Sequence, residues 1–364
     1  MNRKKVIGIF SHVDAGKTTL TEALLYKSGQ ISQLGNVNKG TTFFDYDPLE
    51  RKRGITFLSK PISVDYQEGF TLIDTPGHMD LTFEMERSLQ VTDLAIVLLS
   101  ATEGVTGYTE TIIDLCATYE IPLMVFINKC DLPTSNVPKA LASLEQLDER
   151  FIMVGDQLEI PDFQENWALL DDEWLNQMEE ATVDSIKQEF SRAVRQRKIF
   201  PIIHGSAAQL EGIDTLLDLL MEVQFPASNS ENIGQVYKIL MEKGQRYHLI
   251  KVLSGQFSVK NRLHSPQLPN SEMKINQLFA QRDKLSTIQT AQAGEIVGVT
   301  GLSPLRIGDV FSTTDVSLEQ IPPVQLLTRE PALEVQIVSA LSSDELLSAL
   351  AQLEEEDTSL HVRY

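Results

Sequence analysis

The sequence predicts an α/β domain with a doubly wound, mostly parallel sheet, followed by an antiparallel β-barrel and the start of an α+β unit. Three observations predict this order. In the first half, short apolar runs alternate with helix-like stretches, and polar motifs follow where the runs end. Beyond residue 227 the runs are short, β-rich and separated by glycines. The final stretch combines one more apolar run with an amphipathic helix.

The first polar motif joins a predicted strand to a predicted helix. Val6–Phe10 is an apolar run and Lys17–Lys27 is helix-like, so Ser11-His-Val-Asp-Ala-Gly-Lys-Thr18 lies at a strand-to-helix junction. Backbone N–H groups and a helix N-terminus suit a phosphate chain there. We expect Lys17 to reach the β- and γ-phosphates and Thr18 to ligate Mg²⁺. Because a serine replaces the first glycine of the usual pattern, a plain turn is the alternative for this motif alone.

The next two motifs are predicted to sense the last phosphate. Arg53-Gly-Ile-Thr56 lies in a charged segment, where Thr56 is expected to ligate Mg²⁺ and touch the γ-phosphate only when GTP is bound. Asp74-Thr-Pro-Gly-His78 follows the apolar run Phe70–Ile73. Its aspartate is expected to hold Mg²⁺ through water, its glycine N–H to bond the γ-phosphate, and His78 to orient the attacking water. Alone, Thr56 is a surface threonine and His78 a turn residue.

The fourth motif, Asn128-Lys-Cys-Asp131, ends the run Leu123–Ile127. The Asp131 carboxylate can accept from the N1–H and 2-amino groups of guanine together, a donor pair that adenine lacks. Asn128 and Lys129 are expected to brace the loop and cover the base. A weaker element, Gly205-Ser206-Ala207, is expected to offer N–H groups to guanine O6. A polar turn is the alternative, but the order of all four motifs predicts a P-loop GTPase domain.

These motifs resemble those of a known family. His12-Val-Asp-Ala-Gly-Lys-Thr-Thr19 and Asp74-Thr-Pro-Gly-His78 resemble the translational GTPases, the elongation factor G branch in particular. Release factor 3 usually has proline where this chain has Val13. Four stretches are similar to the ribosomal protection proteins of tetracycline resistance, and elongation factor G usually departs from them. They are Thr19–Tyr26, Lys39–Thr42, Leu49–Thr56 and Phe200–Ala207.

The resemblance implies a set of site residues. His78 is the catalytic residue, Thr18, Thr56 and Asp74 (through water) hold Mg²⁺, and Asp14 is a candidate ligand for a monovalent cation. Val13 and Ile55 match the apolar gate around the histidine. The GTP-binding residues are Ser11, His12, Val13, Asp14, Ala15, Gly16, Lys17, Thr18, Thr19, Thr56, Asp74, Thr75, Pro76, Gly77, Asn128, Lys129, Asp131, Ser206 and Ala207.

The resemblance also implies an activity and partners. The expected function is ribosome-stimulated hydrolysis of GTP to GDP in translation, of the ribosomal protection type, with rRNA and ribosomal proteins as partners. One alternative is an elongation-factor-G-like translocation factor. Another is a GTP-switched ribosome-binding module with negligible intrinsic hydrolysis, which turnover with and without ribosomes would distinguish.

Composition agrees with a soluble cytoplasmic protein, and we expect a monomer that binds neither membranes nor DNA. No run approaches a membrane span, and the N-terminus leads into a strand rather than a signal peptide. The two cysteines, Cys116 and Cys130, predict no disulfide framework and no metal cluster. The formal net charge of -20 is unusual for a ribosome ligand, because phosphate neutralisation normally drives RNA affinity. Basic contacts are therefore expected to be local, with Arg51-Lys-Arg53 as one candidate cluster.

Three domains are expected along these 364 residues. Residues 1–227 form the GTP-binding domain, with an acidic insertion at about 133–199 that is either a solvated helical face or a docking surface for a basic ribosomal protein. Residues 228–325 form the barrel. Residues 326–364 begin a ferredoxin-like third domain, with a strand at 332–338, a helix at 343–356 and the start of a strand at 360–364. The abrupt end is interpreted as a truncation or a fragment.

Overall fold

The computed structural model describes residues 2–35, 60–78, 82–155, 157–158, 160–227, 231–242, 245–268, 271–281, 285–314, 334–356, 360 and 362–363. The chain divides into two compact units, residues 1–226 and 227–364. Within the described ranges, no helix is both long and apolar enough to cross a membrane.

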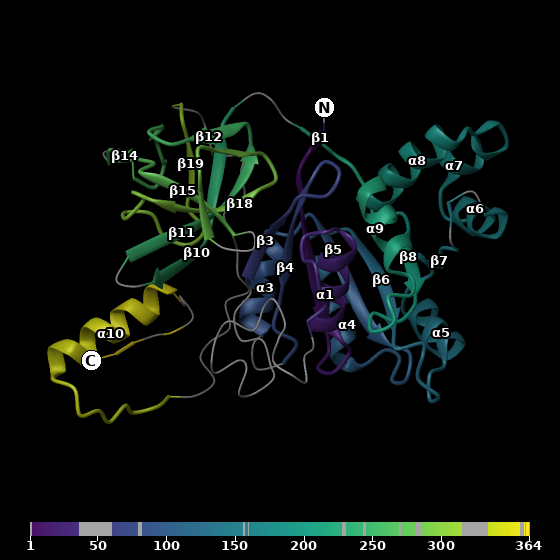
Figure 1. Ribbon diagram of the computed structural model, residues 1–364, viewed down its shortest axis with the longest axis horizontal. Coiled ribbons are helices and arrows are strands. Elements are labelled where there is room, and N and C mark those ends of the chain that lie inside the picture. Colours follow the sequence, from purple (N-terminus) through teal and green to yellow (C-terminus); the bar gives the residue numbers. More distant parts are fainter. Residues whose placement is uncertain are drawn as a thin grey trace. The chain divides into compact units, whose positions relative to one another are not determined.

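The first unit is built on a seven-stranded sheet with the order β3-β4-β2-β5-β6-β8-β7 (Figure 1). All neighbours are parallel except β3, which pairs antiparallel to β4 at one edge. The inner strands are mostly apolar and are buried along their whole length, as a parallel sheet covered by helices on both faces requires. The strands are β2 (Lys5–Ser11), β3 (Lys60–Val64), β4 (Phe70–Asp74), β5 (Leu94–Ser100), β6 (Leu123–Asn128), β7 (Phe151–Met153) and β8 (Phe200–His204).

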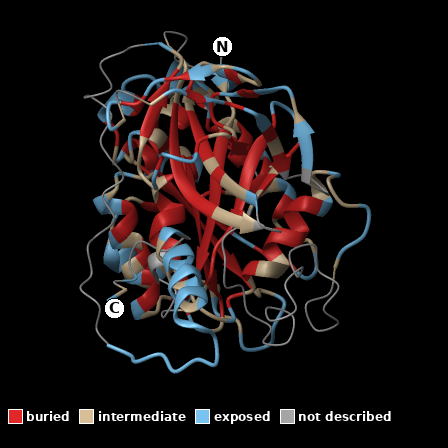
Figure 2. Cartoon of the chain, turned by 90° about the vertical axis from the view of Figure 1, so that its left-hand side faces the viewer, coloured by how far each residue is buried: buried red, intermediate tan, exposed pale blue. Residues whose placement is uncertain are grey.

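Helices cover both faces of this sheet and create two separate cores. One core packs α1 (Lys17–Lys27), α6 (Pro161–Ala168), α8 (Val183–Arg195) and α9 (Ile213–Glu222) against the sheet. The other packs α3 (Thr82–Gln90), α4 (Gly107–Thr118) and α5 (Val137–Leu147) against the opposite face. Figure 2 colours the chain by burial, and the strands are largely buried, drawn in red. The doubly wound α/β prediction is confirmed.

The beginning and the end of the first unit are tied together. β1 (Asn2–Arg3) pairs antiparallel with β9 (Phe225–Pro226). Lys5 is buried and its Nζ donates to the carbonyl oxygens of Leu220 at 2.6 Å and Val223 at 2.7 Å, at the C-terminal end of α9. Burial lowers the pKa of Lys5 to about 8, against the opposing attraction of nearby carboxylates. These contacts place the first strand against the last helix.

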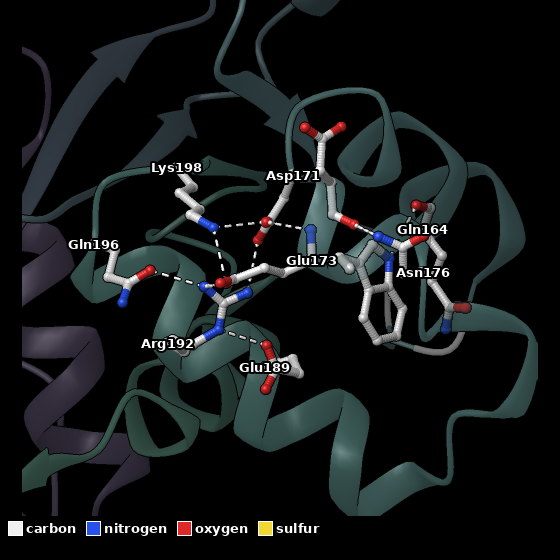
Figure 3. Close-up of polar contacts among 10 residues, drawn as sticks. Gln164, Asp171, Glu173, Asn176, Glu189, Arg192, Gln196 and Lys198 are labelled. Carbon is white, nitrogen blue, oxygen red and sulfur yellow. Dashed lines mark hydrogen bonds and ion pairs between the residues drawn. The ribbon is translucent and has the colours of Figure 1, made fainter.

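The acidic stretch predicted as an insertion folds as α6, α7 (Asp172–Leu175), a 3-10 turn at Met178–Glu180 and α8. Its inner side is aromatic, since Trp167 and Trp174 stack with ring centroids 4.2 Å apart. Most of its carboxylates are exposed, but Asp171 is buried and binds Arg192 at 2.9 Å and Lys198 at 2.7 Å (Figure 3). Burial opposes ionisation of Asp171, yet the bonds from these two cations hold its pKa below the usual value.

The second unit is antiparallel and has its own core, as predicted. Its main sheet has the strand order β16-β15-β18-β11-β10-β19, and the pairs β12-β17 and β13-β14 form two small ribbons. The sheet strands are β10 (Ile233–Glu242), β11 (Gln245–Ser254), β15 (Gln277–Gln281), β16 (Leu285–Ile288), β18 (Ile296–Thr300) and β19 (Val310–Ser312). The ribbon strands are β12 (Gln256–Ser258), β13 (Arg262–Leu263), β14 (Met273–Lys274) and β17 (Thr290–Gln292).

The end of the chain departs partly from the prediction. The helix is confirmed as α10 (Ser343–Glu356), with Leu347 and Leu353 exposed. The predicted strand at 332–338 is wrong for residues 334–338, which have no regular secondary structure, pair with no described strand and are exposed. Residues 360, 362 and 363 likewise form no strand. An apolar alternating run needs a neighbouring strand to satisfy its backbone, and the pairings of the described residues supply none here. The third-domain assignment stays a prediction.

Candidate functional site

The site is built at the carboxyl ends of the central parallel strands, where β2 ends and α1 begins. Gly16 stands before α1 in the left-handed region, with φ 96°, and Asp14 also has a positive φ of 62°. A Cβ at Gly16 would overlap the side-chain amide of Asn128. No side chain caps the first turn of α1, so its backbone N–H groups and its dipole are available to an anion.

The third motif lies beside this loop because β4 is the parallel neighbour of β2, with Asp74 opposite Ile9. Lys17 Nζ donates to Asp74 Oδ1 at 2.6 Å, and both side chains are buried. Thr75 Oγ1 donates to the Ile9 carbonyl oxygen at 2.6 Å and fixes the turn after β4. The structure therefore brings the lysine and the aspartate of two distant motifs into one ion pair.

Asn128 joins three parts of the site. Its Nδ2 donates to the Ala15 carbonyl oxygen of the phosphate loop at 2.9 Å. Its Oδ1 accepts from the Ala207 N–H at 2.9 Å, and its backbone oxygen accepts from the Ala101 N–H at 2.8 Å. Lys129 follows with a positive φ of 64°, and Asp131 is exposed beyond it. One buried amide thus fixes the guanine-side loop relative to the phosphate loop.

The Gly205-Ser206-Ala207 element, whose N–H groups are predicted to face guanine O6, donates within the protein in the described conformation. The Gly205 N–H donates to the Ile127 carbonyl oxygen at 2.9 Å, and the Ser206 N–H donates to the Glu211 carbonyl oxygen at 3.1 Å. The Ala207 N–H is taken by Asn128. Because each donor already has an acceptor, this element braces the loop at the end of β6 in the structure.

The remaining candidate residues differ in their exposure to solvent. Asp14 is exposed. The half-buried candidates are Val13, Thr18, Thr19, Gly77 and His78, and the buried ones are Ser11, Ala15, Thr75 and Pro76. A Cβ at Gly77 would lie 3.3 Å from the Ser11 carbonyl oxygen, so the third motif passes close to the phosphate loop. Thr56, Ile55 and the basic cluster at 51–53 lie outside the described residues.

One neighbour of the loop was missed by the sequence analysis. The His12 ring lies edge-on to the Tyr108 ring, with centroids 6.2 Å apart, and Tyr108 is buried in the first turn of α4. A tyrosine in a helix carries no motif that links it to a loop more than ninety residues away. The contact follows from strand order, because β2 and β5 are adjacent and α4 follows β5.

The donor set at the phosphate loop fits magnesium. Asp74 is a buried carboxylate at a strand end, and Thr18 carries a hydroxyl in the first turn of α1. Mg²⁺ prefers oxygen ligands and usually takes one or two from the protein and the rest from phosphates and water. The residues described contain no group of three or more His, Cys, Asp or Glu that could hold a metal alone. A nucleotide-dependent magnesium is the metal that these residues suit.

A parallel sheet with a phosphate loop, an adjacent buried aspartate and an Asn-Lys-x-Asp loop at its strand ends defines a P-loop nucleotide-binding domain. The family model described as the elongation factor Tu GTP binding domain matches residues 2–225, and the chain belongs to this family.

Curated relatives and a solved structure show the same likeness. The chain is 34% identical to the tetracycline resistance protein TetP of Clostridium perfringens over 391 residues, covering 97% of this chain and 58% of TetP. It is 32% identical to the tetracycline resistance protein TetO of Streptococcus pneumoniae, covering 96% of this chain and 57% of TetO. The chain thus spans less than two thirds of these relatives. A crystal structure of a protein from Thermus thermophilus has a TM-score of 0.88 at 22% identity over 99% of this chain and 62% of that chain.

Proposed function

We propose that this chain binds GTP at the carboxyl edge of its parallel sheet and hydrolyses it to GDP on the ribosome, as a translational GTPase of the ribosomal protection type. The observation that carries the proposal is the position of Asn128, which ties the phosphate loop, the guanine-side loop and the Ala207 element together. Relatives named as tetracycline resistance proteins support the ribosomal protection type.

In this proposal each candidate site residue has a part. Lys17 and the N–H groups of the phosphate loop neutralise the phosphates. The Asp131 carboxylate recognises guanine by accepting hydrogen bonds from its N1–H and 2-amino groups. Thr18 and Asp74 hold Mg²⁺, which supplies further charge neutralisation at the phosphates when bound. His78 positions the attacking water, and Asp14 is a candidate contact for a monovalent cation. Thr56 completes the set as an expectation from the sequence.

The base preference tests the guanine assignment. Asp131→Asn should weaken GTP binding by roughly a hundredfold or more, because charge-assisted bonds to the base are worth on the order of 3 kcal/mol. Xanthosine triphosphate should bind the variant better than GTP, since its 2-oxo group can accept from the new amide. Asp114→Asn, an exposed aspartate on α4, is the matched control and should leave both affinities unchanged. Unchanged GTP preference in Asp131→Asn, measured by fluorescence competition, contradicts the assignment.

Hydrolysis tests the catalytic assignment separately from binding. His78→Ala should bind GTP about as well as the parent chain, while activated hydrolysis falls about 10²-fold or more, the loss typical of a group that handles the reacting water. Thr18→Ala should instead weaken Mg²⁺-dependent binding itself. Turnover is measured with and without ribosomes, so that stimulation and intrinsic rate are read separately. Normal ribosome-stimulated hydrolysis by His78→Ala contradicts the role of the histidine.

A further inference from the structure

The phosphate loop contains a side-chain contact that the motif itself does not explain. His12 Nδ1 lies 2.9 Å from the carbonyl oxygen of Val13, the next residue. A carbonyl oxygen can only accept a hydrogen bond, so Nδ1 must carry the proton in this contact. The imidazole therefore acts as a donor from Nδ1 in both its neutral and its charged form.

This bond fixes the orientation of one peptide in the loop. The described chain contains no cis peptide bond, so the Asp14 N–H points to the opposite side from the Val13 carbonyl. Asp14 has φ 62°, a conformation that costs a non-glycine residue roughly 1–2 kcal/mol. The loop thus needs stabilising contacts to keep this shape. His12 provides two of them: the bond from its Nδ1 to the Val13 carbonyl oxygen, and the bond that its own carbonyl oxygen accepts from the Ala15 N–H at 3.4 Å.

The imidazole is itself held from outside the loop. Its ring meets the Tyr108 ring edge-on at an interplanar angle of 68°. Tyr108 is 4% exposed and lies in the first turn of α4, whose N-terminus is closed by a capping box between Thr106 and Thr109. A well-anchored helix end therefore presents a rigid aromatic ring to His12 and limits the rotation of the imidazole.

We propose that His12 is a positioning residue that turns the Val13–Asp14 peptide so that the Asp14 N–H faces the triphosphate. The inference rests on the proposed function, because it assigns the phosphate chain to this loop. It gives the histidine a task that needs neither contact with the nucleotide nor proton transfer. Asn128 then holds the other end of the same loop through the Ala15 carbonyl oxygen.

Replacement variants test the position of the donor. His12→Ala should weaken both GTP and GDP binding about tenfold or more, the order of loss expected for one hydrogen bond to a charged group. His12→Asn should bind within about threefold of the parent chain, because its amide nitrogen can take the place of Nδ1. His12→Gln, with its amide one bond further out, should resemble His12→Ala. His264→Ala, an exposed histidine of the second unit, is the control and should change nothing.

A second measurement does not depend on nucleotide. Long-range ¹⁵N–¹H correlation spectra of the parent chain should show His12 protonated at Nδ1, with or without GDP. Wild-type affinity in His12→Ala, equal losses in His12→Asn and His12→Ala, or an Nδ1 without its proton would each overturn the inference. A parent chain that shows the Nδ1 proton but binds no guanine nucleotide instead refutes the proposed function.

Discussion

Gly16 is the position in the phosphate loop where backbone conformation and space act together. Its φ of 96° lies in the left-handed region. A Cβ there would overlap the side-chain amide of Asn128, which also bonds the Ala15 carbonyl oxygen of the phosphate loop. Gly29, at the end of the turn after α1, also has a positive φ, of 77°, but a Cβ there has no atom within 4 Å. The two glycines therefore separate backbone strain from steric overlap.

Gly16→Ala should abolish nucleotide binding, because it adds a clash with Asn128 to the strain of a left-handed alanine. Gly29→Ala carries the strain alone, and should lower the free energy of unfolding by about 1 kcal/mol while leaving GTP affinity intact. Urea unfolding and nucleotide titration of both variants make the comparison. Equal GTP affinities for the two variants would show that the Asn128 contact does not shape the pocket.

The identities of the pocket residues were accessible from the sequence, because short-range spacing defines them. Lys17 and Asp74 were assigned from their motifs, and the structure pairs them. The hydrogen bond from the Ala207 N–H could not be predicted from the sequence, because its acceptor is the Asn128 side chain, 79 residues away. Asp171 lies in the acidic insertion, for which the sequence predicts a solvated face or a docking surface, yet this carboxylate is buried and pairs with Arg192 and Lys198. Charge patterns report composition, whereas burial depends on tertiary packing.

At the scale of elements, β11 carries a buried titratable group within an antiparallel sheet. His248 is 1% exposed, and its Nε2 lies 3.2 Å from the Leu305 carbonyl oxygen. Burial, with a smaller effect of Arg246, lowers the pKa of His248 from 6.5 to about 4, against the opposing bond to Leu305. The folded unit therefore holds this histidine neutral where the unfolded chain would protonate it.

The second unit should lose stability as the pH falls from about 6.5 to 4. Between these two pH values His248 is protonated in the unfolded state but neutral in the folded state. The free energy of unfolding therefore drops by about 3 kcal/mol as the pH falls. His248→Gln should remove this component, because its amide cannot titrate. Hydrogen exchange of the β11 amides, compared between the two proteins at each pH, measures the difference. A parallel loss in parent and variant would exclude His248 as the source, and His264→Gln is the control.

Element prediction succeeded where a run had a neighbour to pair with. β10 and β11 extend beyond their apolar stretches, Val236–Leu240 and Leu249–Leu253, because their ladder continues to the pair Glu242 and Gln245. The run at 334–338 has comparable residues but no ladder, and it forms no strand. Strand formation is decided by partners that are distant in sequence, which local patterns do not record.

At the scale of the whole molecule, the hydrophobic cores follow the division of the chain. The two cores of the first unit use no residue beyond Phe225, and the core of the second unit uses residues from Val236 to Phe311. The ties between β1 and β9 and between Lys5 and the end of α9 lie within residues 1–226. Each unit thus contains the contacts that close its own core.

Residues 1–226, expressed alone, should fold and bind GDP and GTP within about threefold of the full chain, because every described pocket residue and both cores are retained. Residues 1–212 are the matched control. They lack α9, whose buried Leu216, Leu217 and Leu220 complete one core, and they should not unfold cooperatively. Nucleotide titration and calorimetry compare the three proteins. Loss of nucleotide binding in residues 1–226 would show that the second unit is needed to form the pocket.

The stacked indoles inside the acidic insertion have an optical consequence. Trp167 and Trp174 are the chain's two tryptophans, and their rings lie 10° from parallel at 4.2 Å. At that separation the electronic transitions of the two rings mix, so they absorb and emit as a coupled pair. All indole emission from this protein therefore originates between α6 and α7, and none originates at the phosphate loop. The chain therefore carries a native chromophore that reports on its insertion.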